Sequence, residues 1–216
     1  MAQAAVENCR GGMEHTRFRI AGLDTGWMNW RVTGPDMDEK VAASWVGYPT
    51  LDPMLRLATS MLIFRKERYF WHLNTVDWDD FVISFPGEPE CYHATFGQPE
   101  GDIVPFLLER CDDDMGTPHA PYVKVGSGTV SMDQFAVDLL TDSFRLLREW
   151  GIVGFRDLWV YSEFPISEFL RLVQARDGGE PCRSGLAQEL TLMTAMLNTP
   201  DTADGGAAPV PGQARL

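Results

Sequence analysis

Acidic side chains crowd the middle of the sequence, and they are the residues whose type and spacing could do chemistry. Segment 77–114 holds eleven acids and one base, Arg110, so its net charge is −10 out of −13 for the 216-residue chain. Carboxylates gathered in this way can attract a basic protein surface or a cation. The acids are Asp77, Asp79, Asp80, Glu88, Glu90, Glu100, Asp102, Glu109, Asp112, Asp113 and Asp114.

Metal and thiol chemistry are the catalytic alternatives. His72 and His93 fall on neighbouring predicted strands, near Asp77 or Glu90, and such a group could bind a metal or act as a general base. Cys91 and His93 share one strand face and resemble a nucleophile with its base, but a strand offers no helix N-terminus to lower the pKa of the thiol. The run 112–114 lacks the spacing of a calcium loop. We therefore expect no metal, no cofactor and no enzymatic activity.

Known catalytic motifs are missing from the sequence. There is no HExxH, GxSxG or GxxxxGK[ST] pattern, and no GxGxxG opens a helix. Gly126-Ser127-Gly128 lies inside a predicted strand and indicates a bulge or bend rather than a phosphate loop. The four cysteines, at positions 9, 91, 111 and 182, suit neither a zinc site nor a disulfide framework, so we expect thiols in a reducing cytosol.

Strands must position most of the acids. Alternating apolar residues and turn signals predict strands at 16–21, 27–32, 40–46, 67–73, 81–85, 90–96, 103–109 and 122–130. The acids of 77–114 fall mostly at strand ends and turns. Because alternate turns of an antiparallel meander share an edge, 77–80 should meet 100–102 at one edge. At the other edge, 88–90 should meet 112–114.

Helices occupy one early position and most of the C-terminal third. A helix fits 53–64, with Asp52 as its cap and Pro53 in its first turn. The clearest helix runs from Ser131, which forms a capping box with Gln134, to a stop at Gly151. Segment 155–161 suits a short strand or a loop. Two more helices are predicted from Pro165 to about 177 and at 184–197.

The order of elements predicts an α+β fold, in which a largely antiparallel meander sheet is packed by one early helix and two or three C-terminal helices. We expect a flexible leader at 1–15, a single domain at 16–197 and a disordered tail at 198–216. The first residues lack the basic and apolar regions of a signal peptide, and no apolar run reaches membrane-spanning length, so we expect a cytoplasmic protein. Its acidity disfavours nucleic acids and anionic membranes as partners.

The overall pattern resembles bacterial immunity proteins of the contact-dependent or polymorphic-toxin kind. The resemblance is carried by VDWDDFVISF at 76–85, by CDDD at 111–114, and by a strand-rich body closed by late helices. Segments 44–58 and 150–165 are also similar to uncharacterised actinobacterial and proteobacterial proteins. Membership among immunity proteins implies one-to-one binding of a cognate toxin, often a basic nuclease, so that a free monomer becomes a heterodimer.

The leading hypothesis is therefore an immunity protein that binds a basic toxin through its acidic surface. Trp78 would serve as an aromatic anchor. The alternatives are the metal-dependent hydrolase above, a non-catalytic adaptor subunit, and acids that are merely solvated. The predicted partner-binding residues are Asp77, Trp78, Asp79, Asp80, Glu88, Glu90, Glu100, Asp102, Asp112, Asp113 and Asp114.

Overall fold

The computed structural model describes residues 15–44, 50–66, 81–87, 90–111, 121–159, 162–177 and 186–197. The chain divides into two compact units, Met1–Arg183 and Ser184–Leu216. The predicted strand at 67–73, residues 1–14 of the predicted leader at 1–15, and the predicted tail at 198–216 lie outside the described residues. None of the described helices is long and apolar enough to cross a membrane.

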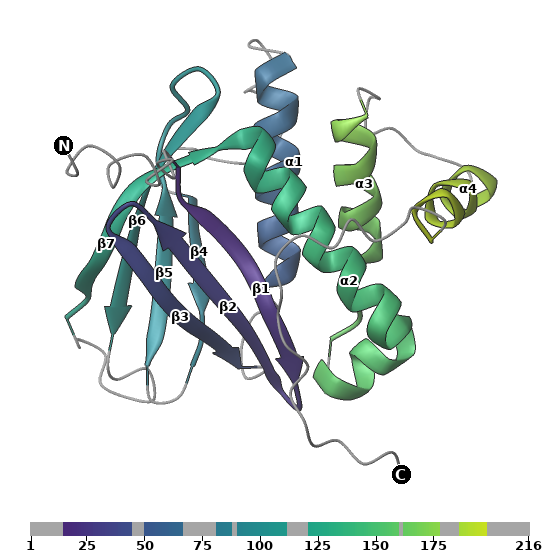
Figure 1. Cartoon of the computed structure of the whole chain (residues 1–216), viewed down its shortest axis with the longest axis horizontal. Helices are drawn as coiled ribbons and strands as arrows, with labels where there is room; N and C mark the ends of the chain where they lie inside the picture. The colour runs from purple at the N-terminus through teal and green to yellow at the C-terminus, as the bar shows by residue number, and fades with distance from the viewer. Residues whose placement is uncertain are drawn as a thin grey trace, which may run out of the picture. The chain divides into compact units, whose positions relative to one another are not determined.

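The first unit is an α+β fold with two antiparallel sheets, which confirms the predicted fold class and divides its strands between two sheets (Figure 1). The smaller sheet has the order β1-β2-β3 and the larger has the order β4-β5-β6-β7. Each sheet is a meander, because every strand pairs with its neighbour in sequence. The strands are β1 (Arg17–Asp24), β2 (Trp27–Gly34), β3 (Met37–Ser44), β4 (Phe81–Phe85), β5 (Cys91–Phe96), β6 (Ile103–Cys111) and β7 (Val123–Ser131).

Backbone hydrogen bonds join the two sheets at two corners. Thr16 N–H, just before β1, donates to the Thr129 carbonyl of β7 at 2.7 Å, and Ser44 N–H at the end of β3 donates to the Pro86 carbonyl after β4 at 2.5 Å. At the second corner, a Cβ on Gly87 would overlap the carbonyl oxygens of Glu90 and Ala42. Glycine therefore permits the close approach that this joint needs.

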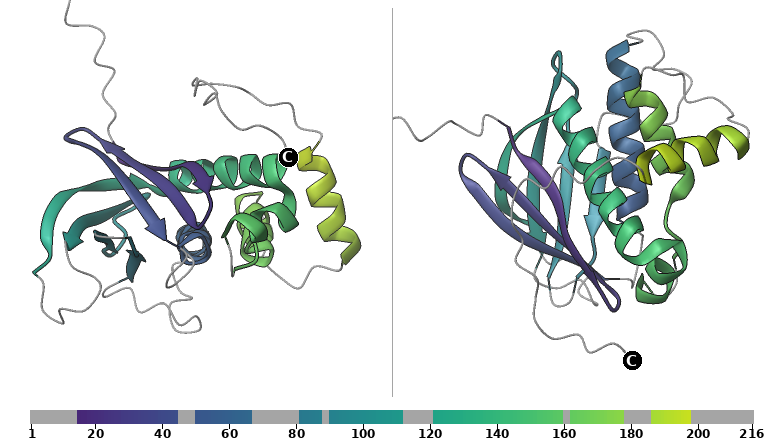
Figure 2. Two further views of the ribbon diagram at one scale, coloured as in Figure 1. Left: turned by 90° about the horizontal axis from the view of Figure 1, so that it is seen from below. Right: turned by 45° about the vertical axis from the view of Figure 1, so that its right-hand side comes forward.

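The first unit also has three helices, and the longest of them runs along the first strand (Figure 2). α1 (Leu51–Lys66) contacts α2 (Met132–Trp159) and α3 (Ile166–Arg176), and α2 lies alongside β1. In α1 the predicted inward residues are buried, with Met54, Ala58 and Met61 at 0% exposure. The sequence pattern thus identified the correct face of this helix.

Aromatic side chains form the centre of the core between the sheets and α2. The Phe18 ring of β1 lies 5.6 Å from Phe96, 5.4 Å from Phe106 and 5.8 Å from Phe135 of α2, measured between ring centroids. These four rings come from four different elements and are all nearly inaccessible to solvent. Their burial and edge-on contacts tie α2 to both sheets.

The prediction of a strand or loop at 155–161 is wrong up to Trp159, because the chain stays helical there. Gly151, with φ 65°, produces a kink in α2, and the helix then resumes. Phe155 and Trp159, four residues apart on one face, are buried beside Phe164. Packing of these rings favours a helix in an aromatic-rich segment whose local pattern favours a strand.

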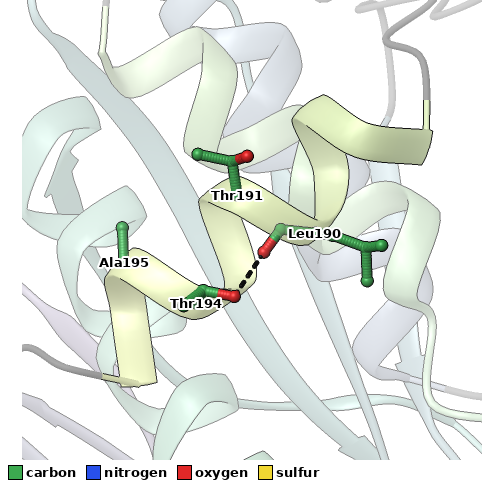
Figure 3. A pocket seen from close by; sticks show the side chains of 4 residues that line it. All are labelled: Leu190, Thr191, Thr194 and Ala195. Carbon is green, nitrogen blue, oxygen red and sulfur yellow. Dashed lines mark hydrogen bonds between the residues drawn. The ribbon is translucent and has the colours of Figure 1, made fainter.

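The second unit contributes one described helix, α4 (Leu186–Leu197), near the predicted position. Figure 3 shows a shallow pocket lined by Leu190, Thr191, Thr194 and Ala195 of this helix. The Thr194 hydroxyl donates to the Leu190 carbonyl at 2.7 Å, and the Thr191 hydroxyl donates to the Ala187 carbonyl at 2.8 Å. Since both hydroxyl protons go to the helix backbone, the pocket offers a ligand little polar recognition.

Candidate functional site

The four-stranded sheet positions the described part of the predicted acidic surface. Its register pairs Phe81 with Phe96, so the start of β4 and the end of β5 share an edge, as the meander argument expects. Cys91 pairs with Cys111, so the start of β5 and the end of β6 share the other edge. The strand ends that flank the acidic segments therefore meet in the predicted combinations.

Three of the eleven predicted partner-binding residues are described, namely Glu90, Glu100 and Asp102. The other eight lie outside the described residues, and their placement stays a prediction. They are Asp77, Trp78, Asp79, Asp80, Glu88, Asp112, Asp113 and Asp114.

Glu100 and Asp102 are exposed on a hydrogen-bonded turn between β5 and β6. Glu100 and Ile103 exchange two backbone hydrogen bonds, of 2.8 and 3.3 Å, and Gly97 N–H donates to the Pro105 carbonyl at 2.9 Å. The Asp102 carbonyl accepts a hydrogen bond of 3.0 Å from Met132 N–H, at the first residue of α2. Two carboxylates are thus carried on a backbone that is fixed before any partner arrives.

Glu90 lies at the opposite edge and has partners inside the molecule. The Tyr92 hydroxyl lies 2.9 Å from Glu39 Oε1 on β3 and 3.1 Å from Glu90 Oε2, and Arg110 lies 3.9 Å from the other Glu90 oxygen. Burial, helped by both carboxylates, raises the pKa of Tyr92 well above its ordinary value. This group links the two sheets, so Glu90 has a structural role beside any role in binding.

Of the two histidines in the metal-dependent hydrolase alternative, the structure describes only His93. His93 of β5 stacks on Tyr122 with ring centroids 4.5 Å apart, and the Tyr122 hydroxyl lies 3.3 Å from His93 Nε2. His72 lies outside the described residues. Among the residues that the structure describes, no group of three or more His, Cys, Asp or Glu side chains could hold a metal ion. The metal-dependent hydrolase therefore rests on the sequence alone.

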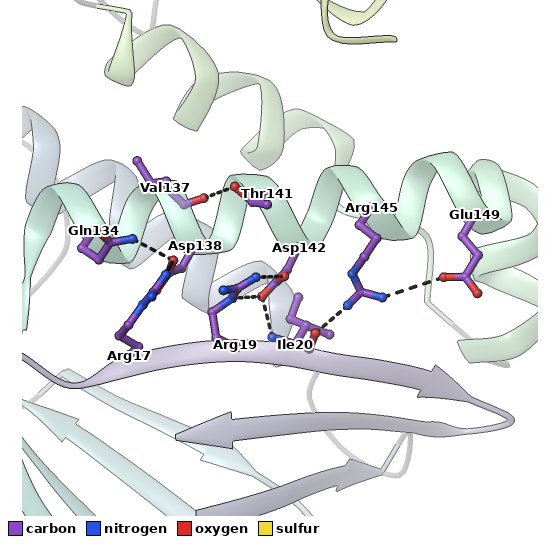
Figure 4. A network of polar contacts seen from close by, with 10 residues as sticks. All are labelled: Arg17, Arg19, Ile20, Gln134, Val137, Asp138, Thr141, Asp142, Arg145 and Glu149. Carbon is purple, nitrogen blue, oxygen red and sulfur yellow. Dashed lines mark hydrogen bonds and ion pairs between the residues drawn. The ribbon is translucent and has the colours of Figure 1, made fainter. Parts of the chain in front are cut away.

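Sequence reasoning missed a charged network that fixes α2 along β1 (Figure 4). Arg17 donates two hydrogen bonds to Asp138, of 2.8 and 2.5 Å, and Arg19 donates two to Asp142, both of 2.8 Å. These hydrogen bonds raise the pKa of both guanidinium groups. The sequence did contain a sign of this network. Two arginines alternate with apolar residues on a predicted strand, and two aspartates lie four residues apart on a predicted helix.

The same network completes the free edge of β1. Ile20 N–H donates to Asp142 at 2.8 Å, and Arg145 donates to the Ile20 carbonyl at 2.5 Å. Side chains of α2 thus replace the strand that would otherwise pair with β1 here. We assign this network to structure, because its carboxylates are buried and already bidentately paired.

The bulge or bend predicted within Gly126-Ser127-Gly128 falls one residue earlier. The β6–β7 register shifts between Leu108, which pairs with Gly126, and Glu109, which pairs with Lys124, so the extra residue is Val125, whereas 126–128 pair regularly with 106–108. Comparisons with known protein families, with curated proteins and with solved structures find no match to this chain.

Proposed function

We propose that this chain is a cytosolic immunity protein, which binds a basic toxin of the nuclease class through the acidic strand ends of its four-stranded sheet. The observation that carries the proposal is the charge of segment 77–114, eleven acids against one base, attached to strand ends that share edges. A lysine- and arginine-rich surface is the natural complement of such an edge.

The absence of an ion pair at Glu100 supports this proposal. Some exposed acids elsewhere in the first unit do have basic partners, such as Asp38 with Arg31 at 2.7 Å and Glu163 with Arg156 at 2.8 Å. Glu100 forms no ion pair with any residue that the structure describes. Its charge, together with the net charge of −10 on segment 77–114, would attract a cationic protein and speed its capture.

The fixed turn at 97–102 supports the proposal in a second way. Binding costs less when the contacting groups are already ordered, because less conformational entropy is lost on association. The hydrogen bonds around Glu100 and Asp102 provide that order on the β5–β6 side. Binding would be one-to-one, and it would neutralise the toxin by covering its active site or a nearby surface. Trp78 would anchor the contact as a desolvated aromatic side chain.

A matched pair of charge reversals tests the proposal. The first step is to search the genes next to this one for a secreted protein with a basic C-terminal domain. That domain, once purified, is the probe, and the readouts are its association rate at several salt concentrations and rescue of growth on co-expression. The proposal loses its partner if no such gene lies there. Glu100→Lys should slow association by roughly tenfold at low salt and flatten its salt dependence. Asp36→Lys makes the same charge change at an exposed turn of the other sheet and should have little effect. Combined reversal of Asp77, Asp79 and Asp80 should abolish rescue.

Two results would reject the proposal. One is an affinity for the toxin domain that no reversal and no salt concentration changes. The other is an equal loss of association rate with Asp36→Lys and Glu100→Lys. That result would mean that the acidic strand ends act only through the overall charge of the protein. The adaptor alternative predicts instead a partner that binds equally well at high salt.

A further inference from the structure

Two buried thiols lie opposite each other on neighbouring strands of the larger sheet. Cys91 is the first residue of β5, Cys111 is the last residue of β6, and the two are Cα partners in the antiparallel ladder. Their exposures are 2% and 4%, and both are thiols in this structure. Strand alternation puts them on the opposite face from Tyr92, together with His93.

The register determines how far apart the two backbones lie. Gly97 N–H donates to the Pro105 carbonyl, so these opposed residues form a hydrogen-bonded pair. Hydrogen-bonded and non-hydrogen-bonded pairs alternate along an antiparallel ladder. Cys91 and Cys111 are six residues from Gly97 and Pro105 in the same register, an even number, so they are a hydrogen-bonded pair too. Cα atoms in such pairs are about 5.5 Å apart, within the range of a disulfide.

The register also indicates that a disulfide between Cys91 and Cys111 would be easily reduced. Cβ atoms of directly opposite residues are about 4.5–5.5 Å apart, and hydrogen-bonded pairs lie toward the upper limit. A disulfide needs roughly 3.5–4.5 Å, so the strands must draw together. The pair lies at the ends of both strands, where local opening is least costly and gives a small oxidant access. A strained cross-link of this kind forms under oxidation and is reversed by small thiols.

We propose that Cys91 and Cys111 form a reversible dithiol–disulfide site that a peroxide oxidises and that cellular thiols reduce. One thiolate attacks the peroxide O–O bond, forms a sulfenic acid and releases hydroxide, which takes up the thiol proton as water. The second sulfur then attacks the sulfenic sulfur, the S–O bond breaks and a second water leaves. The thiols lose two electrons and the peroxide gains them. Two molecules of a small thiol restore both cysteines by exchange and leave as their own disulfide.

The proposal is independent of toxin binding and is tested on the full chain. In a Cys9→Ser/Cys182→Ser variant, only the two facing thiols remain. Equimolar hydrogen peroxide should remove both thiols, lower the intact mass by two hydrogens and give a 91–111 cross-linked peptide. Reduced glutathione should then restore both thiols. Adding Cys111→Ala or Cys111→Ser should leave a sulfenic acid that dimedone traps, without an internal cross-link, and thermal melting checks that each variant is folded.

The proposal is overturned if peroxide leaves both thiols intact in the folded variant while it consumes them in denaturant. It is also overturned if the product is a sulfinic acid on each cysteine or a cross-link between two chains. A 91–111 disulfide that glutathione fails to reduce would contradict the reversibility that the register implies.

Discussion

At the scale of single residues, Asp142 connects two elements that are far apart in sequence. Its side chain is 2% exposed and accepts hydrogen bonds from the Arg19 guanidinium and from Ile20 N–H. Asp142→Ala should leave a buried N–H without an acceptor and a partly exposed cation without its partner. We expect a loss of about 2–3 kcal/mol in the free energy of unfolding, measured by urea denaturation.

The control for Asp142 is a pair with the same chemistry at the surface. Asp38 and Arg31 also form a bidentate contact, and it lowers the pKa of Asp38, but both side chains are more than half exposed. Asp38→Ala should therefore leave the urea midpoint nearly unchanged. Equal losses for the two substitutions would show that burial does not set the value of these pairs.

Tyr92 should make the stability of the protein depend on pH in the alkaline range. Because its pKa is raised in the folded protein, the unfolded chain ionises first as pH rises. Stability should be intact below about pH 10, the ordinary tyrosine pKa, and should fall above it. Tyr92→Phe should cost about 1–2 kcal/mol at neutral pH and should remove part of the alkaline loss. Urea melts of both proteins at neutral and alkaline pH measure the difference, and parallel pH profiles would contradict it.

At the scale of elements, the kink in α2 depends on one glycine. Gly151 has φ 65°, which L side chains rarely adopt, whereas a Cβ on Gly154 would make only an ordinary 3.5 Å contact with Trp150. Gly151→Ala should therefore destabilise the protein by about 1–2 kcal/mol. Gly154→Ala should be neutral or stabilise it by up to about 1 kcal/mol. Thermal melts of the two variants should diverge in opposite directions, and the prediction fails if they do not.

Elements whose signals are local could be predicted from the sequence. The helix around Met54 and Met61 and the strands of the larger sheet follow periodicity and turn residues, and the structure has them within a few residues. The helical segment at 152–159 could not be predicted, because burial against Phe164 decides it. The capping box at Ser131 formed only in half. Gln134 N–H lies 3.5 Å from the Ser131 hydroxyl, while the Gln134 side chain donates to Asp138.

The candidate site also has a part that could be predicted from the sequence and a part that could not. The shared edges follow from the meander and were predictable, whereas the contact of Glu90 with Tyr92 needs the joint between two sheets. The pairing of Arg17 with Asp138 spans 121 residues, and no local pattern specifies such a partner. Long-range electrostatic contacts are thus the part of this fold that sequence periodicity leaves open.

At the scale of the whole molecule, the acids proposed to favour binding of a basic partner should also lower the stability of the free protein. Close like charges at strand ends repel by a few tenths to one kcal/mol per pair, and the fold gains nothing from them. With 31 acids and 18 bases in the chain, screening should relieve more repulsion than it costs in attraction. Added sodium chloride should therefore raise the melting temperature, by about 2–4 °C for each kcal/mol relieved.

The source of that increase can be located with the variants already described. Glu100→Lys removes one acid from the acidic strand ends and adds a base. It should therefore raise the melting temperature at low salt and reduce the further rise in melting temperature that sodium chloride causes. Asp36→Lys changes the total charge equally but lies away from those strand ends, so its salt-induced rise should stay closer to that of the original protein. Equal salt-induced rises for both variants would mean that total charge alone governs stability. If Glu100→Lys stabilises the free protein while it weakens capture of the toxin domain, these acids are retained at a cost to folding, as a binding surface requires.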